Sequence, residues 1–305
     1  LSKNLLEKGY HVRILDDYSR GIPQRLESFI DDVEMIDGDI RDFDTVLKAT
    51  DGIDFFYHLA AVNGTENFYS ISNRVLEVGV KGTLNAIDAS IKSGCEKFIF
   101  ASSAEVYQQP THIPTRESER LIIPDISNPR FSYSSSKLIG EMLCLHYLPK
   151  DQIDSIIFRP HNIYGPDMGF KHVIPQFCQK IFDIKQSGDT ILNIQGTGEE
   201  TRSFCFVEDA VEGIILVSEK GKSGELYHIG TTEEVTISNL ANMVALEMGH
   251  SVKVEASLDL LEGSTSRRCP SIDKIGSLGY DPKINLNTGV ERTCAWYKEY
   301  FERSS

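Results

Sequence analysis

The sequence predicts an α/β fold built on a doubly wound parallel sheet. Helix-like and strand-like segments alternate along the chain, and the strand segments are near-continuous apolar runs such as Lys97–Ala101. Such runs are expected where helices cover both faces of a parallel sheet, because neither face of its strands then meets water. With 305 residues, the chain is long enough for one large domain or two smaller ones.

The first element is predicted to be a helix over residues 1–9 that ends at Gly9, since glycine favours the left-handed conformation found after helices. In a nucleotide-binding sheet of this kind, a strand and a glycine-rich turn come before that helix. This sequence contains neither of them, because its first residues already belong to the predicted helix. We therefore expect that the sequence starts roughly fifteen residues late, compared with a complete βα unit. The alternative is that the protein begins here and has lost the loop.

The later elements follow from apolar patterns bounded by turn residues. Strands are predicted at 10–15, 33–36, 54–59, 97–101 and 155–158, and helices at 43–49, 68–93, 133–147, 173–185, 207–219 and 286–301. A loop is predicted at 108–129, and a hairpin at 192–206 with its turn at 195–198. The alternation becomes less regular after residue 165, and no internal repeat interrupts it.

Composition and charge exclude several classes of function. The net charge of −14 and the pI near 5.0 exclude a broad nucleic-acid surface, although a few local arginines can still bind an anionic diphosphate. No apolar run of about 18 residues is present, so no membrane span or membrane partner is expected. The six scattered cysteines predict free thiols in a reducing cytosol and, with the dispersed histidines, no metal site.

The chemistry of the chain centres on Phe131–Lys137, where a tyrosine and a lysine stand four residues apart at the start of a predicted helix. Tyr133 and Lys137 would lie on one helical face, about one turn apart. An ammonium held there favours the phenolate, so a phenol that titrates at about 10 could act as a base closer to neutral pH. The spacing alone is common by chance, and two ordinary polar residues on an exposed face are the alternative.

Polar residues also follow the predicted strands. Ser103 and Glu105 come just after 97–101, and ligands of parallel sheets bind beyond the carboxyl ends of the strands. Asp16 follows 10–15, where an acidic residue can hydrogen-bond an adenosine ribose. Each has a plainer interpretation, because Asp16 can be a turn residue and Glu105 can simply bond to its own loop.

Four collinear segments, which together span most of the chain, carry a resemblance to a known family. They are Phe100–Tyr107, Tyr133-x-x-x-Lys137, Arg159–Pro166, and Gly196-Thr197-Gly198 through Arg202-Ser203-Phe204 to Val207 and Asp209. On these segments the chain resembles the extended short-chain dehydrogenase/reductases, which are NAD-dependent nucleotide-sugar epimerases and dehydratases. The resemblance implies a Rossmann-like NAD-binding domain at residues 1–165. It also implies a smaller C-terminal α/β domain at 166–305 that is mainly substrate-binding, with some segments returning to the first domain.

The resemblance also implies roles for individual residues. Ser103 would hydrogen-bond the sugar hydroxyl that is oxidised, Tyr133 would remove its proton, and Lys137 would hold the nicotinamide ribose and keep the pKa of the tyrosine low. The hydride would pass from C4 of the sugar to NAD. The implied cofactor-binding residues are Asp16, Asp39, Ile40, Leu59, Ala60, Ala61, Tyr133, Lys137 and Pro160. The implied contacts to the substrate diphosphate are Asn162, Arg202 and Arg268, although Arg267 and Arg268 can also form a solvated loop.

Three departures from the family pattern bear on function. The glycine-rich loop is absent, and Gly79 stands where the family usually has the asparagine of Asn-x-x-Gly-Thr, so two usual cofactor contacts are missing. Ala104-Glu105 stands where the sugar 4,6-dehydratases often place Asp-Glu. After C4 oxidation, a 4-epimerase needs no further acid or base, whereas a dehydratase does. We therefore favour 4-epimerisation as the reaction. The alternative is 4,6-dehydration or decarboxylation, in which Glu105 would be a catalytic residue.

Two further alternatives concern the class of protein. One is a catalytically silent nucleotide-binding protein of the same fold, and the other is a plain alcohol dehydrogenase that acts on an apolar ketone. The family resemblance implies a cytoplasmic homodimer, with helices near 68–93 and 134–147 as the contact surface, and a nucleotide-sugar substrate.

Overall fold

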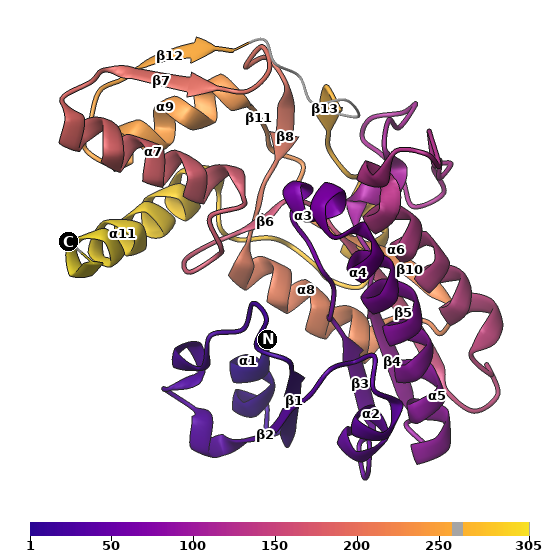
Figure 1. Cartoon of the computed structure of the whole chain (residues 1–305). Coiled ribbons are helices and arrows are strands. Elements are labelled where there is room, and N and C mark those ends of the chain that lie inside the picture. Colours follow the sequence, from indigo (N-terminus) through magenta and orange to yellow (C-terminus); the bar gives the residue numbers. More distant parts are fainter. Residues whose placement is uncertain (258–264, 305) are drawn as a thin grey trace. The chain divides into compact units, whose positions relative to one another are not determined.

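The structure is a computed structural model that describes residues 1–257 and 265–304. The chain forms two compact units, each built from three segments (Figure 1). Unit 1 consists of Leu1–Val106, Leu121–Arg159 and Gly213–Tyr227, and unit 2 consists of Tyr107–Arg120, Pro160–Glu212 and His228–Ser305. No described helix is long and apolar enough to span a membrane.

A four-stranded sheet of order β10-β5-β4-β3 runs through unit 1. Its strands are β3 (Phe55–His58), β4 (Lys97–Ala101), β5 (Asp154–Pro160) and β10 (Glu225–Ile229), and β3, β4 and β5 pair in parallel. A second parallel sheet joins β1 (Val12–Asp16) to β2 (Val33–Asp37), in register from Val12–Val33 to Asp16–Asp37. Consecutive residues of β4 are buried on both faces, which is the pattern that the apolar runs predict.

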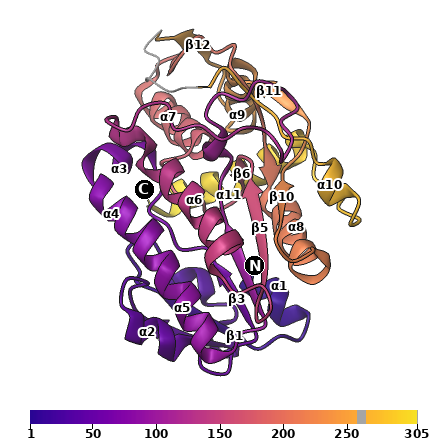
Figure 2. The same ribbon diagram turned by 90° about the vertical axis from the view of Figure 1, so that its right-hand side faces the viewer.

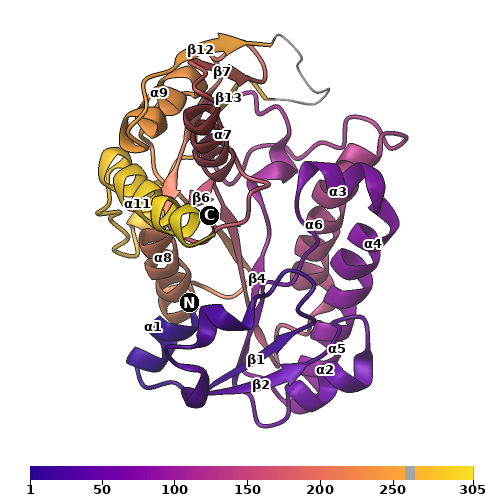
Figure 3. The ribbon, with the colours of Figure 1, turned by 60° about the vertical axis from the view of Figure 1, so that its left-hand side comes forward.

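Helices cover both faces of the four-stranded sheet. Figures 2 and 3 show α5 and α6 side by side along one face, with α8 along the other. The helical elements of unit 1 are α1 (Ser2–Glu7), η1 (Pro23–Leu26), η2 (Ile30–Asp32), α2 (Phe43–Ala49), α3 (Thr65–Ser70), α4 (Ser72–Leu76), η3 (Glu77–Gly82), α5 (Thr83–Ser93), η4 (Ala104–Tyr107), η5 (Pro129–Phe131), α6 (Ser132–Met142) and η6 (Leu143–Tyr147). Helix α8 (Val207–Lys220) begins in unit 2 and ends in unit 1. The predicted doubly wound α/β fold is therefore confirmed.

The helix predicted at 68–93 is interrupted twice. The backbone leaves helical geometry at Ile71, and η3 is a π-helical turn. Gly79 in this turn packs so closely on α6 that a Cβ atom there would overlap the Ser136 side chain. Close approach of the two elements therefore accounts for the glycine at position 79, where an asparagine could not fit without a shift of Ser136.

Unit 2 is built on three mutually packed helices, α7 (Val173–Ser187), α9 (Ile237–Glu247) and α11 (Leu286–Ser304). Their apolar faces form one core around Ile181, Val244 and Tyr297. The remaining elements are β6 (Ile163–Tyr164), β7 (Ile191–Ile194), β8 (Thr201–Ser203), β9 (Cys205–Phe206), β11 (Glu234–Thr236), β12 (Lys253–Ala256), β13 (Arg267–Arg268) and α10 (Asp273–Gly276). A parallel β7–β12 pair lies against α7 and α9.

The hairpin predicted at 192–206 is wrong. Strand β7 pairs with β12, whereas β8 pairs antiparallel with β11 and parallel with β13. Between β7 and β8, Gly196 and Gly198 have φ of 78° and 83°, and the Glu200 carboxylate accepts the backbone N–H groups of Thr197 and Gly198. This turn leads the chain into another sheet, where partners distant in sequence complete the pairing.

Candidate active site

Strand β4 and helix α6 bring three of the four predicted catalytic side chains together in unit 1. Ser103 follows β4, and its side chain is hydrogen-bonded to that of Tyr133 near the start of α6. One turn later, Lys137 donates a hydrogen bond of 2.7 Å from Nζ to the Ala101 carbonyl, with Nζ 5.8 Å from the centre of the Tyr133 ring. The tyrosine and the lysine are both more than nine-tenths buried. Residues distant in sequence thus converge at the carboxyl end of β4.

Burial dominates the proton affinities of this pair. Burial raises the pKa of Tyr133 to about 12, and nearby Glu105 also raises it. The hydrogen bond from Ser103 and the charge of nearby Arg20 lower it. Burial likewise lowers the pKa of Lys137 to about 8, because both charged forms lose hydration. The low tyrosine pKa predicted from the sequence is therefore not found in the protein by itself, where desolvation of the phenolate is the largest effect.

Two side chains that sequence reasoning missed lie beside Tyr133. Phe68 of α3 stacks on the tyrosine ring, with centroids 5.1 Å apart and planes at 11°. The Arg130 guanidinium lies 5.3 Å from the centre of the Phe68 ring, and its Nη2 donates to Glu105 Oε2 at 3.1 Å. Glu105 is thus an ion-pair partner in the site. Its spacing after β4 indicated the carboxylate, whereas no sequence signal indicated its partner.

A buried ion pair supports the same region. Glu141, one turn after Lys137, accepts hydrogen bonds from Nε and Nη2 of Arg159 at 2.7 and 2.5 Å. The Ser102 hydroxyl also donates to Glu141. Both charged side chains are about 95% buried, at 4% and 5% exposure. This network ties α6 to the ends of β4 and β5, next to Ser103, and its only sequence signal was a second i, i+4 spacing after Lys137.

The cofactor residues predicted in unit 1 lie at or near strand ends. Asp16 ends β1, where its carboxylate accepts the backbone N–H of Tyr18 at 2.8 Å. Leu59 and Ala60 follow β3 and are exposed, Leu59 by 46%, and Ala61 is half-buried. Asp39 forms an ion pair of 2.6 Å with Arg41, whose hydrogen bonds lower the pKa of the carboxyl group, and Ile40 is buried.

These residues fit parts of NAD. A carboxylate at a strand end, such as Asp16, suits a ribose diol, and a buried cation beside a tyrosine suits the nicotinamide ribose. The exposed Leu59 at the end of β3 leaves the backbone there open to the wall of a cofactor site. No glycine-rich turn for the diphosphate occurs in the sequence. Gly79 packs on Ser136, so the asparagine contact usual in the family is absent for a steric reason.

In unit 2, the structure brings two of the predicted substrate residues together. Arg202 and Arg268 are register partners on β8 and β13, so their side chains share one face. Arg202 donates from Nη2 to the Thr265 carbonyl at 2.5 Å, and Arg268 donates to the Thr265 hydroxyl at 3.4 Å. Arg267, the adjacent residue on β13, instead forms a 2.6 Å ion pair with Glu234.

The other predicted positions in unit 2 are Asn162 and Pro160. Asn162 has φ of 42° and donates from Nδ2 to the Ser203 carbonyl at 2.8 Å, so the backbone next to Arg202 holds its amide. Pro160 is the last residue of β5 and is half-buried. The Arg267–Arg268 pair is a short strand and not the solvated loop that was the alternative.

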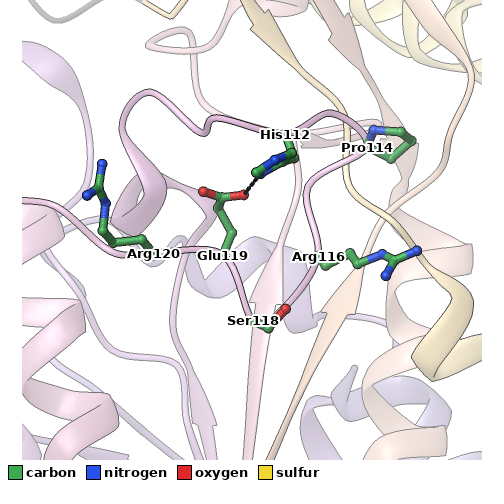
Figure 4. Close-up of a pocket in the computed structure, with 6 residues that line it drawn as sticks. All are labelled: His112, Pro114, Arg116, Ser118, Glu119 and Arg120. Carbon is green, nitrogen blue, oxygen red and sulfur yellow. Dashed lines mark hydrogen bonds and ion pairs between the residues drawn. The ribbon is translucent and has the colours of Figure 1, made fainter.

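A hollow of about 560 Å³ in unit 2 contains none of the predicted site residues (Figure 4). Its lining is His112, Pro114, Arg116, Ser118, Glu119 and Arg120. Glu119 accepts hydrogen bonds from Thr111 and His112, while Arg116 and Arg120 point away from each other. The charged groups therefore do not converge on one point.

All six cysteines are free and buried, as the scattered spacing predicts. Within residues 1–257 and 265–304, no three His, Cys, Asp or Glu side chains are placed to hold a metal ion.

Comparison with known proteins gives a family and several relatives. The model of the family described as "NAD dependent epimerase/dehydratase family" matches residues 1–230. The UDP-N-acetyl-alpha-D-glucosaminuronate decarboxylase of Bacillus cytotoxicus is 30% identical over 309 residues, which cover 98% of this chain and 94% of the relative. The dTDP-D-glucose 4,6-dehydratase of Bos taurus is 31% identical over 276 residues, which cover 88% of this chain and 75% of the relative.

Solved structures have the same fold. The dTDP-glucose 4,6-dehydratase DesIV of Streptomyces venezuelae, solved with NAD and TYD bound, superposes with a TM-score of 0.86 at 27% identity. The match covers 99% of this chain and 93% of that one. The fold in which Ser103, Tyr133 and Lys137 come together is therefore also the fold of this solved structure.

Proposed function

Because this chain belongs to the NAD-dependent epimerase/dehydratase family, we propose that it modifies a nucleotide sugar through transient oxidation at C4 of the sugar. The observation that carries the proposal is the convergence of Ser103, Tyr133 and Lys137 at the carboxyl end of β4. Bound NAD would accept the hydride and return it. Asp16 would hold the adenosine ribose, Leu59 would lie near the cofactor diphosphate, and Lys137 would hold the nicotinamide ribose.

The protein's part in the oxidation is proton transfer and orientation. Tyr133 would take the proton of the C4 hydroxyl, and Ser103 would hydrogen-bond both that hydroxyl and the phenol. Lys137, with its pKa near 8, remains mostly charged at neutral pH and favours the phenolate. Exclusion of water from these buried side chains strengthens each of these interactions.

Hydride return to the other face of the keto-sugar would complete 4-epimerisation, the simplest outcome, because it needs no group beyond these three. Glu105 supports a second candidate. A C4 ketone acidifies the C–H at C5, and it makes a C6 carboxylate into a β-keto acid that can lose carbon dioxide. The Arg130 ion pair holds Glu105 near Tyr133, where a carboxylate could exchange a proton at C5. Two of the relatives, a decarboxylase and a 4,6-dehydratase, are named for reactions beyond C4.

The products distinguish these outcomes. The natural full-length protein is incubated with NAD and with UDP-, GDP-, CDP- and dTDP-linked hexoses and uronates, and the products are read by mass and NMR. Unchanged mass with inverted C4 means epimerisation, loss of water means dehydration, and loss of carbon dioxide means decarboxylation. If none of these sugars is changed and none binds, the proposed function is wrong. Turnover of small apolar ketones without nucleotide binding would favour a plain alcohol dehydrogenase.

Glu105→Gln separates the two candidates. We expect a pure 4-epimerase to keep turnover within about tenfold, because Glu105 then acts only through the pKa of Tyr133. A dehydratase or decarboxylase would lose roughly a hundredfold or more in kcat, the usual contribution of a positioned acid or base. Glu77→Gln, an exposed carboxylate paired with Arg41 in the same unit, is the matched control. A Glu105→Gln variant that makes dehydrated or decarboxylated product at the normal rate would remove Glu105 from the mechanism.

We further propose that Arg202 and Arg268 bind the substrate diphosphate, with Asn162 beside them. Two guanidinium groups on one face of paired strands can both donate hydrogen bonds to one anion, and charge-assisted bonds of this kind are strong. Arg202→Ala and Arg268→Ala are each expected to raise KM by roughly tenfold to a hundredfold. Arg267→Ala, whose side chain pairs with Glu234, is expected to leave KM unchanged. Equal effects from all three variants would contradict this assignment.

The homodimer remains a prediction, and so does the cytoplasmic location. The exposed apolar side chains of unit 1 in the helical segments from α3 to η6 suit a second copy of the chain. They are Tyr69, Ile71, Leu76, Ile139, Met142 and Tyr147. A mass measurement of the full-length protein in solution tests the dimer.

A further inference from the structure

Arg130 contacts both the carboxylate and the ring that lie next to Tyr133. Its Nη2 donates to Glu105 Oε2 at 3.1 Å, and its guanidinium carbon lies 5.3 Å from the centre of the Phe68 ring. Phe68 is itself stacked on Tyr133. The side chains of Arg130 and Glu105 are only 12% and 21% exposed, so solvent screens their interaction less than that of a surface pair.

The local backbone fixes where this arginine sits. Pro129 begins the η5 turn, and the Asn128 side chain caps it by accepting the backbone N–H of Arg130 at 2.9 Å. The turn leads directly into α6, so Arg130 and Tyr133 are held three residues apart in a short ordered stretch. A guanidinium suits this place better than an ammonium, because it is planar, stacks on rings and keeps its charge at every accessible pH.

We propose that Arg130 is a positioning residue, which fixes the Glu105 carboxylate beside Tyr133 and compensates its negative charge there. The geometry of the contacts carries this inference, and it rests on the proposed function only in giving Tyr133 the proton transfer. Arg130 itself is not placed in contact with substrate or cofactor.

The charges that act on Tyr133 give the expected signs. Burial and Glu105 raise its pKa, and the Ser103 hydrogen bond and Arg20 lower it. Lys137 is a further cation on the same helix, with Nζ 5.8 Å from the ring centre. Removal of the Arg130 charge takes away a cation that pairs with Glu105, so the Tyr133 pKa should rise. Removal of Glu105 leaves Arg130 uncompensated, so the pKa should fall. Removal of both should bring it back close to its starting value.

The test is a double-mutant cycle read on the ionisation of Tyr133. The full chain is labelled with 3-fluorotyrosine, which is more acidic than tyrosine, and titrated by ¹⁹F NMR without substrate or cofactor. Tyr133→Phe assigns the signal among the twelve tyrosines. We expect Arg130→Gln to raise the apparent pKa by roughly half a unit to one unit, Glu105→Gln to lower it by a similar amount, and the double variant to lie within about 0.3 unit of wild type.

Three variants serve as controls. Arg130→Lys keeps the positive charge, so its Tyr133 pKa is expected to stay close to that of the wild type. Arg74→Gln removes an exposed cation that pairs with Asp17 in the same unit, and is expected to change nothing. If Arg130→Gln does not fold, the proposal is tested with Arg130→Lys and Glu105→Gln. If charge is responsible, the Tyr133 pKa of Arg130→Lys stays close to that of the wild type, whereas the Tyr133 pKa of Glu105→Gln shifts.

An unchanged titration in Arg130→Gln would overturn the proposal. So would a double variant that titrates like Arg130→Gln alone, since the effect would then not pass through Glu105. A pH profile of kcat/KM, where turnover is found, should move in the same directions as the NMR titration. If no nucleotide sugar is turned over but the cycle shows the cancellation, the role of Arg130 stands and the proposed function fails.

Discussion

Tyr133→Phe is expected to abolish turnover while substrate binding stays intact. The substitution removes one hydroxyl, the group that would accept the C4 proton, and leaves the ring stacked on Phe68. A positioned acid–base group typically accelerates a reaction by about a hundredfold to ten-thousandfold. The value of kcat/KM should therefore fall by about a hundredfold or more. Because the hydroxyl is not placed in the binding of the nucleotide, the Kd of the nucleotide sugar should stay within about threefold. Steady-state kinetics and calorimetric binding measure the two effects separately.

Tyr147→Phe is the matched control for this variant. Tyr147 lies at the end of the same helical segment, is 51% exposed and donates to Asp88 at 2.9 Å. Loss of that exposed bond should leave both kcat and binding unchanged. Full activity of Tyr133→Phe would remove Tyr133 from proton transfer, and equal loss of activity in both variants would indicate a general effect on the fold.

The second large effect is expected from Glu141→Leu, which leaves the Arg159 guanidinium buried without its carboxylate. Removal of one partner from a buried ion pair typically costs about 3–5 kcal/mol, because the remaining buried charge loses the attraction of its counter-ion. The free energy of unfolding should fall by that amount in urea titrations followed by circular dichroism. The loss of the Ser102 hydrogen bond adds to the same cost.

A matched control and a rescue accompany this prediction. Glu219→Gln removes an exposed partner of Lys8 in the same unit and should cost at most about 1 kcal/mol. The double variant Glu141→Leu with Arg159→Met removes both buried charges and should recover much of the lost stability. A Glu141→Leu variant as stable as the wild type would show that the Arg159 pair contributes little.

The network around Glu141 also explains how the active site keeps its shape. Ser102 is bonded to Glu141 and precedes Ser103, so the buried pair fixes the backbone that presents the Ser103 hydroxyl. Lys137 lies one turn before Glu141 on the same helix and bonds to Ala101 at the end of β4. The end of β4 is therefore held by two side chains of α6, which bond to the two residues directly before Ser103.

Much of this organisation could be predicted because it depends on local patterns. Helix α2 and strand β4 begin and end at the predicted residues, since an apolar period and its end signals lie within one segment. The Tyr133–Lys137 spacing likewise needs only the geometry of a helix. The interrupted helix at 68–93 was missed because the packing of Gly79 on Ser136 involves a partner 57 residues away (136 − 79).

The sequence by itself determined the class of sheet, the family and the three side chains that meet at the end of β4. Tertiary structure decided which charges act together: Arg130 with Glu105, Glu141 with Arg159, and Arg202 facing Arg268 while Arg267 turns to Glu234. It also decided that burial governs the pKa of Tyr133. The reason is physical, because periodicity and capping are properties of neighbouring residues, whereas desolvation and ion pairing depend on groups that only the folded chain brings together.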